Sequence, residues 1–188
     1  MTPALIVVTG APGSGKSTVA VPLAERLRLP LIAKDELKEA LWEQLGSGDR
    51  DRFLAYGRAT YPLMLLVARL VLRSGGSAMV EANFRPDLAA ADLEALREET
   101  PFRVVQILCR ADPETCLARY RERAETDARH PMHRVGGMES EAGVERGLRE
   151  GVWERPIPLD GKVFTVDTTE PVDVDALADG VQAALTEA

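Results

Sequence analysis

The chain has 188 residues, a formal net charge of −7, 45% hydrophobic and 28% charged residues. This composition is typical of a folded globular protein and excludes the disordered, collagen-like and membrane-spanning classes. With two cysteines there is no disulfide framework, which favours a reducing, cytoplasmic setting. An acidic chain provides no general attraction for polyanions, so neither a long nucleic acid nor a membrane is expected as a partner.

The hydrophobic pattern alternates short β-branched runs with longer helical ones. It predicts strands at residues 5–8, 31–33, 77–81, 103–109 and 162–166. It predicts helices at residues 16–29, 35–45, 51–73, 87–99, 112–125 and 173–185, with a kink or break at Pro62. The alternation indicates one domain over residues 1–188, a three-layer α/β/α fold with a five-stranded, mostly parallel sheet. The weakly patterned segment, about residues 124–158, is expected to form a helical lid.

A complete phosphate-binding motif follows the first predicted strand. Its eight residues match G-x-x-x-x-G-K-[ST] and are Gly10, Ala11, Pro12, Gly13, Ser14, Gly15, Lys16 and Ser17. Backbone N–H groups of such a loop surround a phosphate at a helix N-terminus. Lys16 would reach the β- and γ-phosphates, the Ser17 hydroxyl would bind Mg²⁺, and Thr18, the next residue, is also expected to contact the nucleotide. The alternative is a glycine-rich turn, but the position between a strand and a helix favours binding of ATP and Mg²⁺.

With this motif and element order, the sequence resembles the P-loop kinase branch of the nucleoside-triphosphate-binding proteins. Shikimate kinase, gluconate kinase, chloramphenicol phosphotransferase and the polynucleotide kinase domain share this architecture. The resemblance extends through most of the chain, although its motifs are specific at only a few places. It implies a P-loop NTPase fold and transfer of the γ-phosphate of ATP to a hydroxyl group.

Candidate acceptor-side residues follow the second and third predicted strands. Asp35 would face the phosphate loop, and the resemblance implies that it orients the hydroxyl and accepts its proton. Its alternative role is to cap the helix. Lys38 occupies a position where the related kinases often have arginine, and Glu81 would hold Mg²⁺ or the acceptor unless it is a buried glutamate paired with a base. Asn83 and Arg85 are weaker candidates for acceptor binding.

Basic residues cluster after the fourth predicted strand, as in kinase lids. We expect Arg123 to act on the transferring phosphoryl group, and Arg119 and Arg129 to contact the nucleotide. The alternative is that these arginines are ordinary solvated helix charges. His130 and His133 are interpreted as acceptor-pocket or lid residues, because no third ligand accompanies them and Pro131 interrupts their spacing.

Two further groups of residues are candidates for weaker roles. In the fold that the sequence resembles, the loop after the last strand lies beside adenine, so Thr168 and Thr169 are possible nucleotide contacts. The helices between Asp35 and Arg73 would shape the acceptor pocket. Four aromatic residues there could form its wall or belong to the core, namely Trp42, Phe53, Tyr56 and Tyr61.

The motifs favour an ATP-dependent kinase that phosphorylates a small-molecule hydroxyl, with a metabolite or an antibiotic as acceptor. One alternative is a polynucleotide 5′-hydroxyl kinase, which the acidic charge and the 5% aromatic content argue against. The other is a regulatory protein that binds ATP without catalysis. The identity of the acceptor is not encoded in a recognisable motif.

Overall fold

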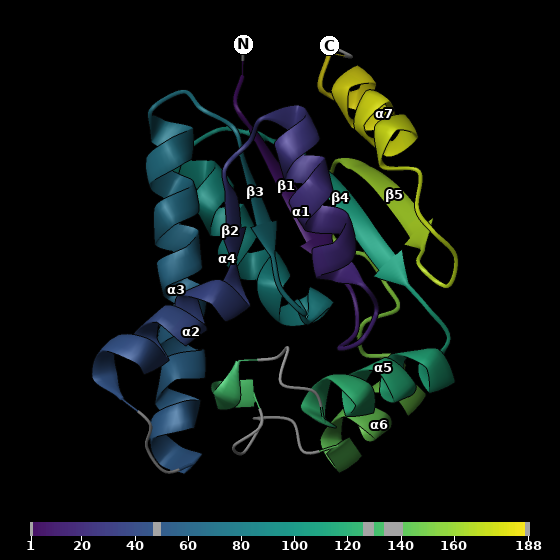
Figure 1. The fold of residues 1–188 in the computed structure, drawn as a ribbon. Helices are drawn as coiled ribbons and strands as arrows, with labels where there is room; N and C mark the ends of the chain where they lie inside the picture. The colour runs from purple at the N-terminus through teal and green to yellow at the C-terminus, as the bar shows by residue number, and fades with distance from the viewer. Residues whose placement is uncertain (1, 47–49, 126–129, 134–140, 187–188) are drawn as a thin grey trace.

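The computed structural model describes residues 2–46, 50–125, 130–133 and 141–186. Within these residues, five parallel strands are covered by helices on both faces (Figure 1). The strands are β1 (Ala4–Thr9), β2 (Leu31–Ala33), β3 (Ala78–Glu81), β4 (Arg103–Arg110) and β5 (Lys162–Asp167). All four neighbouring pairs are parallel, so the predicted α/β class is confirmed and the sheet is parallel throughout.

The strand order β2-β3-β1-β4-β5 places β1 at the centre of the sheet. All six residues of β1 are buried, because its side chains pack alternately against the two helical layers. The carboxyl ends of parallel strands meet at one edge, where ligands bind in such sheets. At that edge, Glu81 at the end of β3 is paired with Val8 of β1 on one side and Ala33 of β2 on the other.

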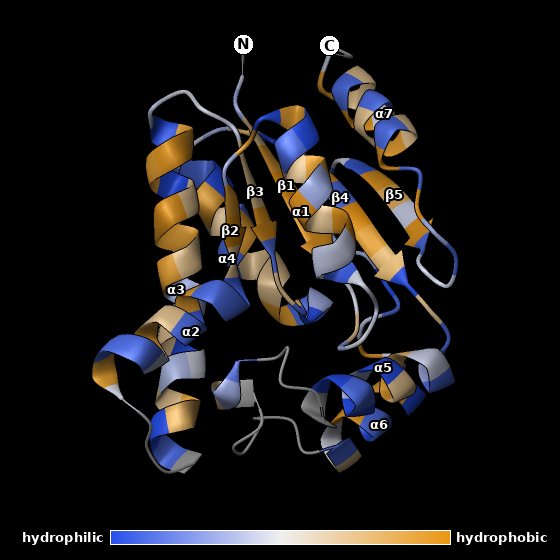
Figure 2. Ribbon diagram, viewed as in Figure 1, coloured by the Kyte–Doolittle hydropathy of each residue, from blue (hydrophilic) through white to orange (hydrophobic). Residues whose placement is uncertain are grey.

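Seven α-helices lie within the described residues, and Figure 2 shows hydrophobic residues concentrated in the strands that they cover. Buried residues of α1 and α7 pack on one face of the sheet, and those of α3 and α4 pack on the other. Helix α2 packs against α3, and α5 packs against α6 near the carboxyl edge (Figure 1). The helices are α1 (Lys16–Leu27), α2 (Lys34–Leu45), α3 (Arg50–Arg73), α4 (Pro86–Glu99), α5 (Pro113–Glu125), α6 (Glu141–Arg149) and α7 (Val174–Thr186).

Helix α3 begins one residue earlier than predicted and is not broken at Pro62. It continues through Pro62 for 24 residues, so the break considered at this position is wrong. Proline removes one helical hydrogen bond, but tertiary packing outweighs that loss because Met64, Ala68 and Leu72 are buried against the sheet. None of the helices in the described ranges, this one included, is long and apolar enough to cross a membrane.

The segment that follows α6 is attached to the sheet by one buried amide. Gln106 on β4 is fully buried, and its Nε2 donates to the carbonyl oxygen of Ile157 at 2.9 Å. In return, the backbone N–H of Ile157 donates to the Gln106 Oε1 at 2.8 Å. A glutamine in the middle of a buried strand is therefore satisfied by the chain that covers it. These two hydrogen bonds anchor the segment between α6 and β5 to the sheet.

Candidate active site

The phosphate-binding loop lies between β1 and α1, as the motif predicts. Gly13 and Gly15 have positive φ angles of 79° and 75°, a backbone conformation that residues with a Cβ rarely adopt. The loop is also tightly packed against the rest of the chain. A Cβ at Gly13 would lie 2.1 Å from the carbonyl oxygen of Cys116 in α5, and one at Gly10 would lie 2.3 Å from that of Cys109 in β4. The motif glycines are therefore required by packing as well as by conformation.

Gly13→Ala is expected to destabilise the chain more than Gly75→Ala does. Both glycines have positive φ, 79° and 84°, so both replacements carry a conformational cost of about 1–2 kcal/mol. Only alanine at position 13 collides with the backbone of Cys116, which adds about 1–3 kcal/mol; at Gly75 no atom of the described residues lies within 4 Å. Equilibrium urea unfolding measures both losses of stability. Equal losses would contradict the packing argument.

The ammonium group of Lys16 lies inside the loop. Its Nζ donates to the carbonyl oxygen of Ala11 at 2.8 Å, and only 7% of the residue is exposed. Helix α1 begins at Lys16 and has no acidic residue in its first turn. The ammonium and the positive end of the helix dipole therefore act at the same place. Together with the backbone N–H groups, they form a site suited to an anion such as a phosphate.

Glu81 lies between the phosphate-binding loop and α2. The hydroxyl of Ser17 donates to the Glu81 Oε2 at 3.2 Å. Burial raises the pKa of the Glu81 carboxyl group, and the charge of Asp35 raises it further, whereas Lys16 and the Ser17 hydrogen bond lower it. The carboxylate is thus held between cationic and anionic neighbours at the edge of the sheet. Its neighbours Lys16, Ser17 and Asp35 are those expected of a group that binds a cation or a hydroxyl.

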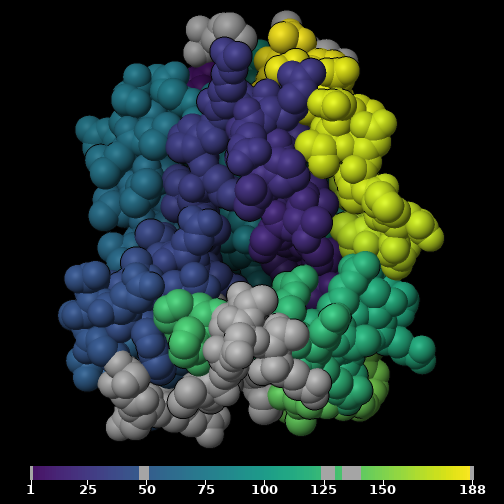
Figure 3. Space-filling view, in the orientation of Figure 1, coloured from purple at the N-terminus to yellow at the C-terminus, as the bar shows by residue number. Residues whose placement is uncertain are grey.

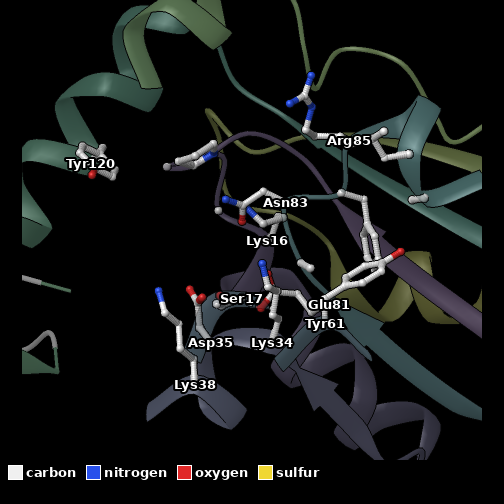
Figure 4. Close-up of a pocket in the computed structure, with 18 of the residues that line it drawn as sticks. Lys16, Ser17, Lys34, Asp35, Lys38, Tyr61, Glu81, Asn83, Arg85 and Tyr120 are labelled. Atoms are coloured by element: carbon white, nitrogen blue, oxygen red, sulfur yellow. Dashed lines mark hydrogen bonds between the residues drawn. The ribbon is translucent and has the colours of Figure 1, made fainter. Parts of the chain in front are cut away.

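Asp35 is in the first turn of α2 but does not cap this helix. The helix begins at Lys34, and Ala33 occupies the N-cap position without a side-chain hydrogen bond. The capping role considered for Asp35 is therefore not the one seen. Its exposed carboxylate lines the cavity beside the loop and is close enough to Glu81 to raise the pKa of that group. Figure 4 shows Asp35 beside Ser17 and Glu81, with Lys16 close by.

A cavity of about 470 Å³ extends from the loop toward α3 and α4. Figure 3 shows a recess between the α1 and α2 regions and the green segment around α5. Seven residues predicted for acceptor binding or catalysis line this cavity, namely Lys16, Asp35, Lys38, Glu81, Asn83, Arg85 and Arg123. Lys38 is buried, and its Nζ lies 3.4 Å from the centre of the Phe53 ring. In Figure 4 the guanidinium group of Arg85 points away from Asp35 and Lys38.

The other lid residues have different surroundings. Arg119 donates from Nη2 to the carbonyl oxygen of Thr168 at 2.8 Å, so it connects α5 to the loop after β5. His130 lies 3.7 Å from Glu43 and packs edge-on against the ring of Trp42, on α2 rather than in the cavity lining. His133 ends a short 3-10 helix, but its side chain is outside the described residues. Arg129 also lies outside them.

Thr168 supports the phosphate-binding loop through its side-chain hydroxyl group. Its hydroxyl Oγ1 is within 2.8 Å of the Ser14 carbonyl oxygen and 3.0 Å of the Arg110 carbonyl oxygen. A Cβ at Gly15 would lie 3.2 Å from the Thr168 Cβ. Thr169 instead donates to the Asp167 carboxylate from both its backbone N–H and its hydroxyl, on the surface. Thr168 therefore positions the loop, a role that the sequence did not indicate.

Ser14 faces a second cavity, of about 400 Å³, between the ends of β4 and β5 and the segment after α6. The Ser14 hydroxyl is buried and has no hydrogen-bond partner among the described residues. Ala11 and Thr169 also line this second cavity. The loop thus separates two cavities, and the motif residues Lys16 and Ser17 belong to the first of them.

The sequence indicates some of the residues that line the cavity and gives no signal for others. Tyr61 and Phe53 were considered as wall residues and do line the cavity, whereas Tyr56 is buried with its hydroxyl bonded to the Gly46 carbonyl oxygen. Lys34 precedes Asp35 and could have been found by its position. The remaining lining residues are brought to the cavity by tertiary packing, and they include Gly57, Phe84, Leu88, Ala89, Asp92 and Tyr120.

Glu81→Gln is expected to leave the fold at least as stable at neutral pH while reducing any activity of the site. Because the pKa of Glu81 is raised, the folded state favours its protonated carboxyl group. The contribution of this protonated group to folding stability is fully present below the ordinary glutamate pKa. It is lost as the pH rises from that value through the raised one. The amide does not ionise, so the free energy of unfolding of the variant should increase relative to that of the wild type as the pH rises.

Urea unfolding between pH 4 and pH 8 measures this difference. Glu25→Gln, at an exposed position on α1, is the matched control and should show much less pH-dependent gain. A difference that is constant with pH, or that reverses sign, would contradict the placement of Glu81 in a desolvated site.

Comparisons with known proteins agree with this geometry. The model of a family described as an AAA domain matches residues 5–143, which is more than half of the chain. A search among curated proteins returns no match. The family match includes the phosphate-binding loop, Asp35, Glu81 and Arg123, so it covers the residues that line the first cavity near the loop.

Solved structures extend the likeness to the whole chain. A candidate kinase from Chloroflexus aurantiacus J-10-fl is 36% identical, with a TM-score of 0.89, and the alignment covers 99% of this chain and 100% of that one. A gluconokinase from Sinorhizobium meliloti 1021 is 17% identical, with a TM-score of 0.54 and 99% coverage of both chains. APS kinase from Mycobacterium tuberculosis, in complex with AMPPNP and APS, is 18% identical, with a TM-score of 0.59 and 99% coverage of both. The last two share the fold.

Proposed function

Because the chain belongs to the AAA-domain family, with a P-loop kinase fold, we propose that it transfers the γ-phosphate of ATP to a hydroxyl group of a small molecule. One observation carries the proposal. Asp35 lines the same cavity as Lys16 and Ser17 and is free of a capping role. A phosphoryl donor bound at the loop and a hydroxyl next to Asp35 would therefore meet in one cavity.

The loop residues fit a nucleoside triphosphate with Mg²⁺. The Ser17 hydroxyl and the Glu81 carboxylate are hard oxygen donors already in contact at 3.2 Å. No group of three or more His, Cys, Asp or Glu within the described ranges is arranged to hold a metal by itself, and Mg²⁺ usually binds through one or two protein oxygens together with phosphates. Bound there, Mg²⁺ would neutralise charge between the β- and γ-phosphates.

The proposed reaction uses three side chains of the cavity. The acceptor hydroxyl gives its proton to the Asp35 carboxylate while its oxygen forms a bond to the γ-phosphorus. The bond from that phosphorus to the bridging oxygen breaks, and ADP leaves. Lys16 and Arg123 stabilise the negative charge of the transferred group, and the buried position of Lys16 strengthens its effect. Arg119 and Thr168, which are bonded to each other beside the loop, are proposed to contact the nucleotide.

A transfer assay tests the proposal. The protein is incubated with Mg²⁺ and γ-labelled ATP together with a panel of hydroxylated metabolites and antibiotics, and a parallel reaction contains a 5′-hydroxyl oligonucleotide. Label in one or more small molecules is the expected result. Label in the oligonucleotide alone would favour a polynucleotide kinase, against which the net charge of −7 argues. Tight ATP binding without transfer to any acceptor would favour a regulatory protein.

A further inference from the structure

Helix α3 is apolar on two opposite sides in its second half. The inner side packs on the sheet with Met64, Ala68 and Leu72, all of which are buried. The outer side presents large hydrophobic residues to solvent at a spacing of three or four positions, namely Leu63, Leu66, Val67 and Leu70. A helix that is apolar on all sides is normally covered on all sides. The outer side of α3 is therefore expected to bind a partner.

The exposed hydrophobic residues of α3 form one contiguous surface. Seven large hydrophobic side chains are exposed in the described part of the chain, and four of them are on this side of α3, between 37% and 58% exposed. Figure 2 shows the upper half of α3 mainly in orange, at the outside of the molecule. With the exposed smaller residues on the same side, we define the outer face of α3 as Ala55, Ala59, Pro62, Leu63, Leu66, Val67 and Leu70. Contiguous apolar surfaces of this kind mark interaction sites.

The charges of the chain favour a protein over a lipid surface as the partner. Anionic lipid surfaces attract clusters of Lys and Arg. Arg69, beside the outer face, is paired with Glu99 of α4 at 3.1 Å, and the chain has a net charge of −7. An anionic membrane would therefore repel most of the molecule, whereas a second apolar protein surface would not.

The two halves of the outer face are complementary in size. The first half has the small residues Ala55 and Ala59, and the second half has Leu66 and Leu70. When two copies of α3 pack antiparallel about a two-fold axis at the middle of this face, Leu66 of each copy lies opposite Ala59 of the other. Leu70 then lies opposite Ala55. Large side chains meet small ones along the whole contact, so the face fits a second copy of itself.

The charges at the two ends of α3 are complementary in the same arrangement. Asp51 is exposed in the first turn, and Arg73 is exposed in the last turn. Along one helix they are about 33 Å apart, so they cannot pair within one chain. In the antiparallel arrangement, Asp51 of each copy lies beside Arg73 of the other. The two-fold axis repeats this contact, so that one ion pair closes each end of the interface.

The contact area is sufficient for a weak dimer. The outer face and the residues beside it would bury about 500 Å² on each copy and about 1,000 Å² in total, near the lower limit for a specific interface. The cavity beside the phosphate-binding loop would stay open, because the α3 residues that line it, Phe53, Gly57 and Tyr61, lie on the opposite side of the helix. Dimerisation through α3 is thus compatible with ligand binding.

We propose that the outer face of α3 binds the same face of a second copy of this chain, in an antiparallel two-fold dimer. Leu66 packs on Ala59 of the other copy, and Asp51 pairs with Arg73 of the other copy. The proposal does not depend on the phosphotransferase function, because no residue of this interface lines the cavity.

Sedimentation velocity of the full chain without nucleotide tests the proposal. The mass is expected to rise with concentration from that of one chain toward that of two, with a dissociation constant of about 1–100 µM. Leu66→Asp should weaken the dimer at least about tenfold, because two carboxylates would be buried at the centre of the contact. Val21→Asp is the matched control. Val21 is 43% exposed on α1, which packs on the opposite face of the sheet, and this variant should dimerise like the wild type.

A charge exchange tests the antiparallel arrangement. Asp51→Arg and Arg73→Asp should each weaken the dimer several-fold, because each places like charges together at both ends of the interface. The double variant should recover most of the wild-type affinity, because it restores both pairs with exchanged signs. Both single changes also oppose the dipole of α3, and the double variant combines these costs. Recovery would therefore arise from contact between the chains, and thermal unfolding verifies that each variant is folded.

Three results would overturn the proposal. A wild-type chain that remains monomeric far above the expected dissociation constant would show that the face does not bind a second copy. A dimer that is unaffected by Leu66→Asp would use another surface. A double charge variant that dimerises no better than the single variants would contradict the antiparallel arrangement. Concentration-dependent dimerisation that is lost in Leu66→Asp and recovered in the double charge variant would support it.

Discussion

Replacing Lys16 with methionine is expected to lower the rate of phosphoryl transfer by at least about 10³-fold while the chain stays folded. Methionine is similar in length to lysine and fills the same buried space, but it removes the only ammonium group of the loop motif. The charge that would stabilise the γ-phosphoryl oxygens is lost. The pKa of Glu81 should rise further, because Lys16 is the largest of the influences that lower it.

Steady-state transfer measured with the best acceptor of the panel gives the rate, and thermal unfolding verifies the fold. Lys162→Met is the matched control, because Lys162 is exposed on β5 and its Nζ lies 6.0 Å from the Phe164 ring, away from the cavity. This control should retain nearly full activity. A Lys16→Met protein that is folded and retains a tenth of the wild-type rate would exclude the proposed role of the loop lysine.

Replacing Asp35 with asparagine is expected to lower kcat by about 10²- to 10⁴-fold without weakening nucleotide binding. Asparagine keeps the shape of the side chain, but it cannot accept the proton of the acceptor hydroxyl. Because Asp35 is exposed and does not cap α2, the loss should not arise from unfolding. Removing its charge should also lower the pKa of Glu81 toward the ordinary value, since Asp35 is one of the groups that raise it.

The measurement is kcat for the wild type and Asp35→Asn, together with the dissociation constant for AMPPNP by calorimetry. Glu36→Gln is the matched control, because it removes the neighbouring exposed carboxylate in the same turn of α2 but does not change the cavity lining. Its kcat should stay within a few-fold of the wild type. Equal activity of Asp35→Asn and the wild type would exclude Asp35 as the base and favour another proton acceptor, such as Glu81.

The loop and the strand edge were predictable because their signals are local. A glycine-lysine-serine motif between a strand and a helix can be recognised from spacing, and the ends of parallel strands must meet at one edge. Asp35 and Glu81 were therefore expected at the cavity, and both line it. The ends of the helices differed by one or two residues, and the break at Pro62 did not occur because α3 packs along the sheet.

The remaining features depend on contacts between distant residues. Thr168 supports the Ser14 backbone across 154 positions of the chain, and Gln106 holds Ile157 across 51. Neither pairing has a sequence signal, because each requires the sheet and its covering segments to be in place. The same holds for Leu88 and Asp92 of α4, which reach the cavity only because α4 packs beside α3.

The sequence by itself determined that this chain is an acidic α/β protein with a phosphate-binding loop, because composition, alternation of elements and a contiguous motif are local properties. Only the tertiary structure decided what lies opposite the loop. Residues of α2, α3, β3 and α4 enclose a cavity that is ionic at Asp35 and apolar at Tyr61 and Leu88. Burial and proximity, which raise the pKa of both Glu81 and Tyr61, arise only when these elements pack together.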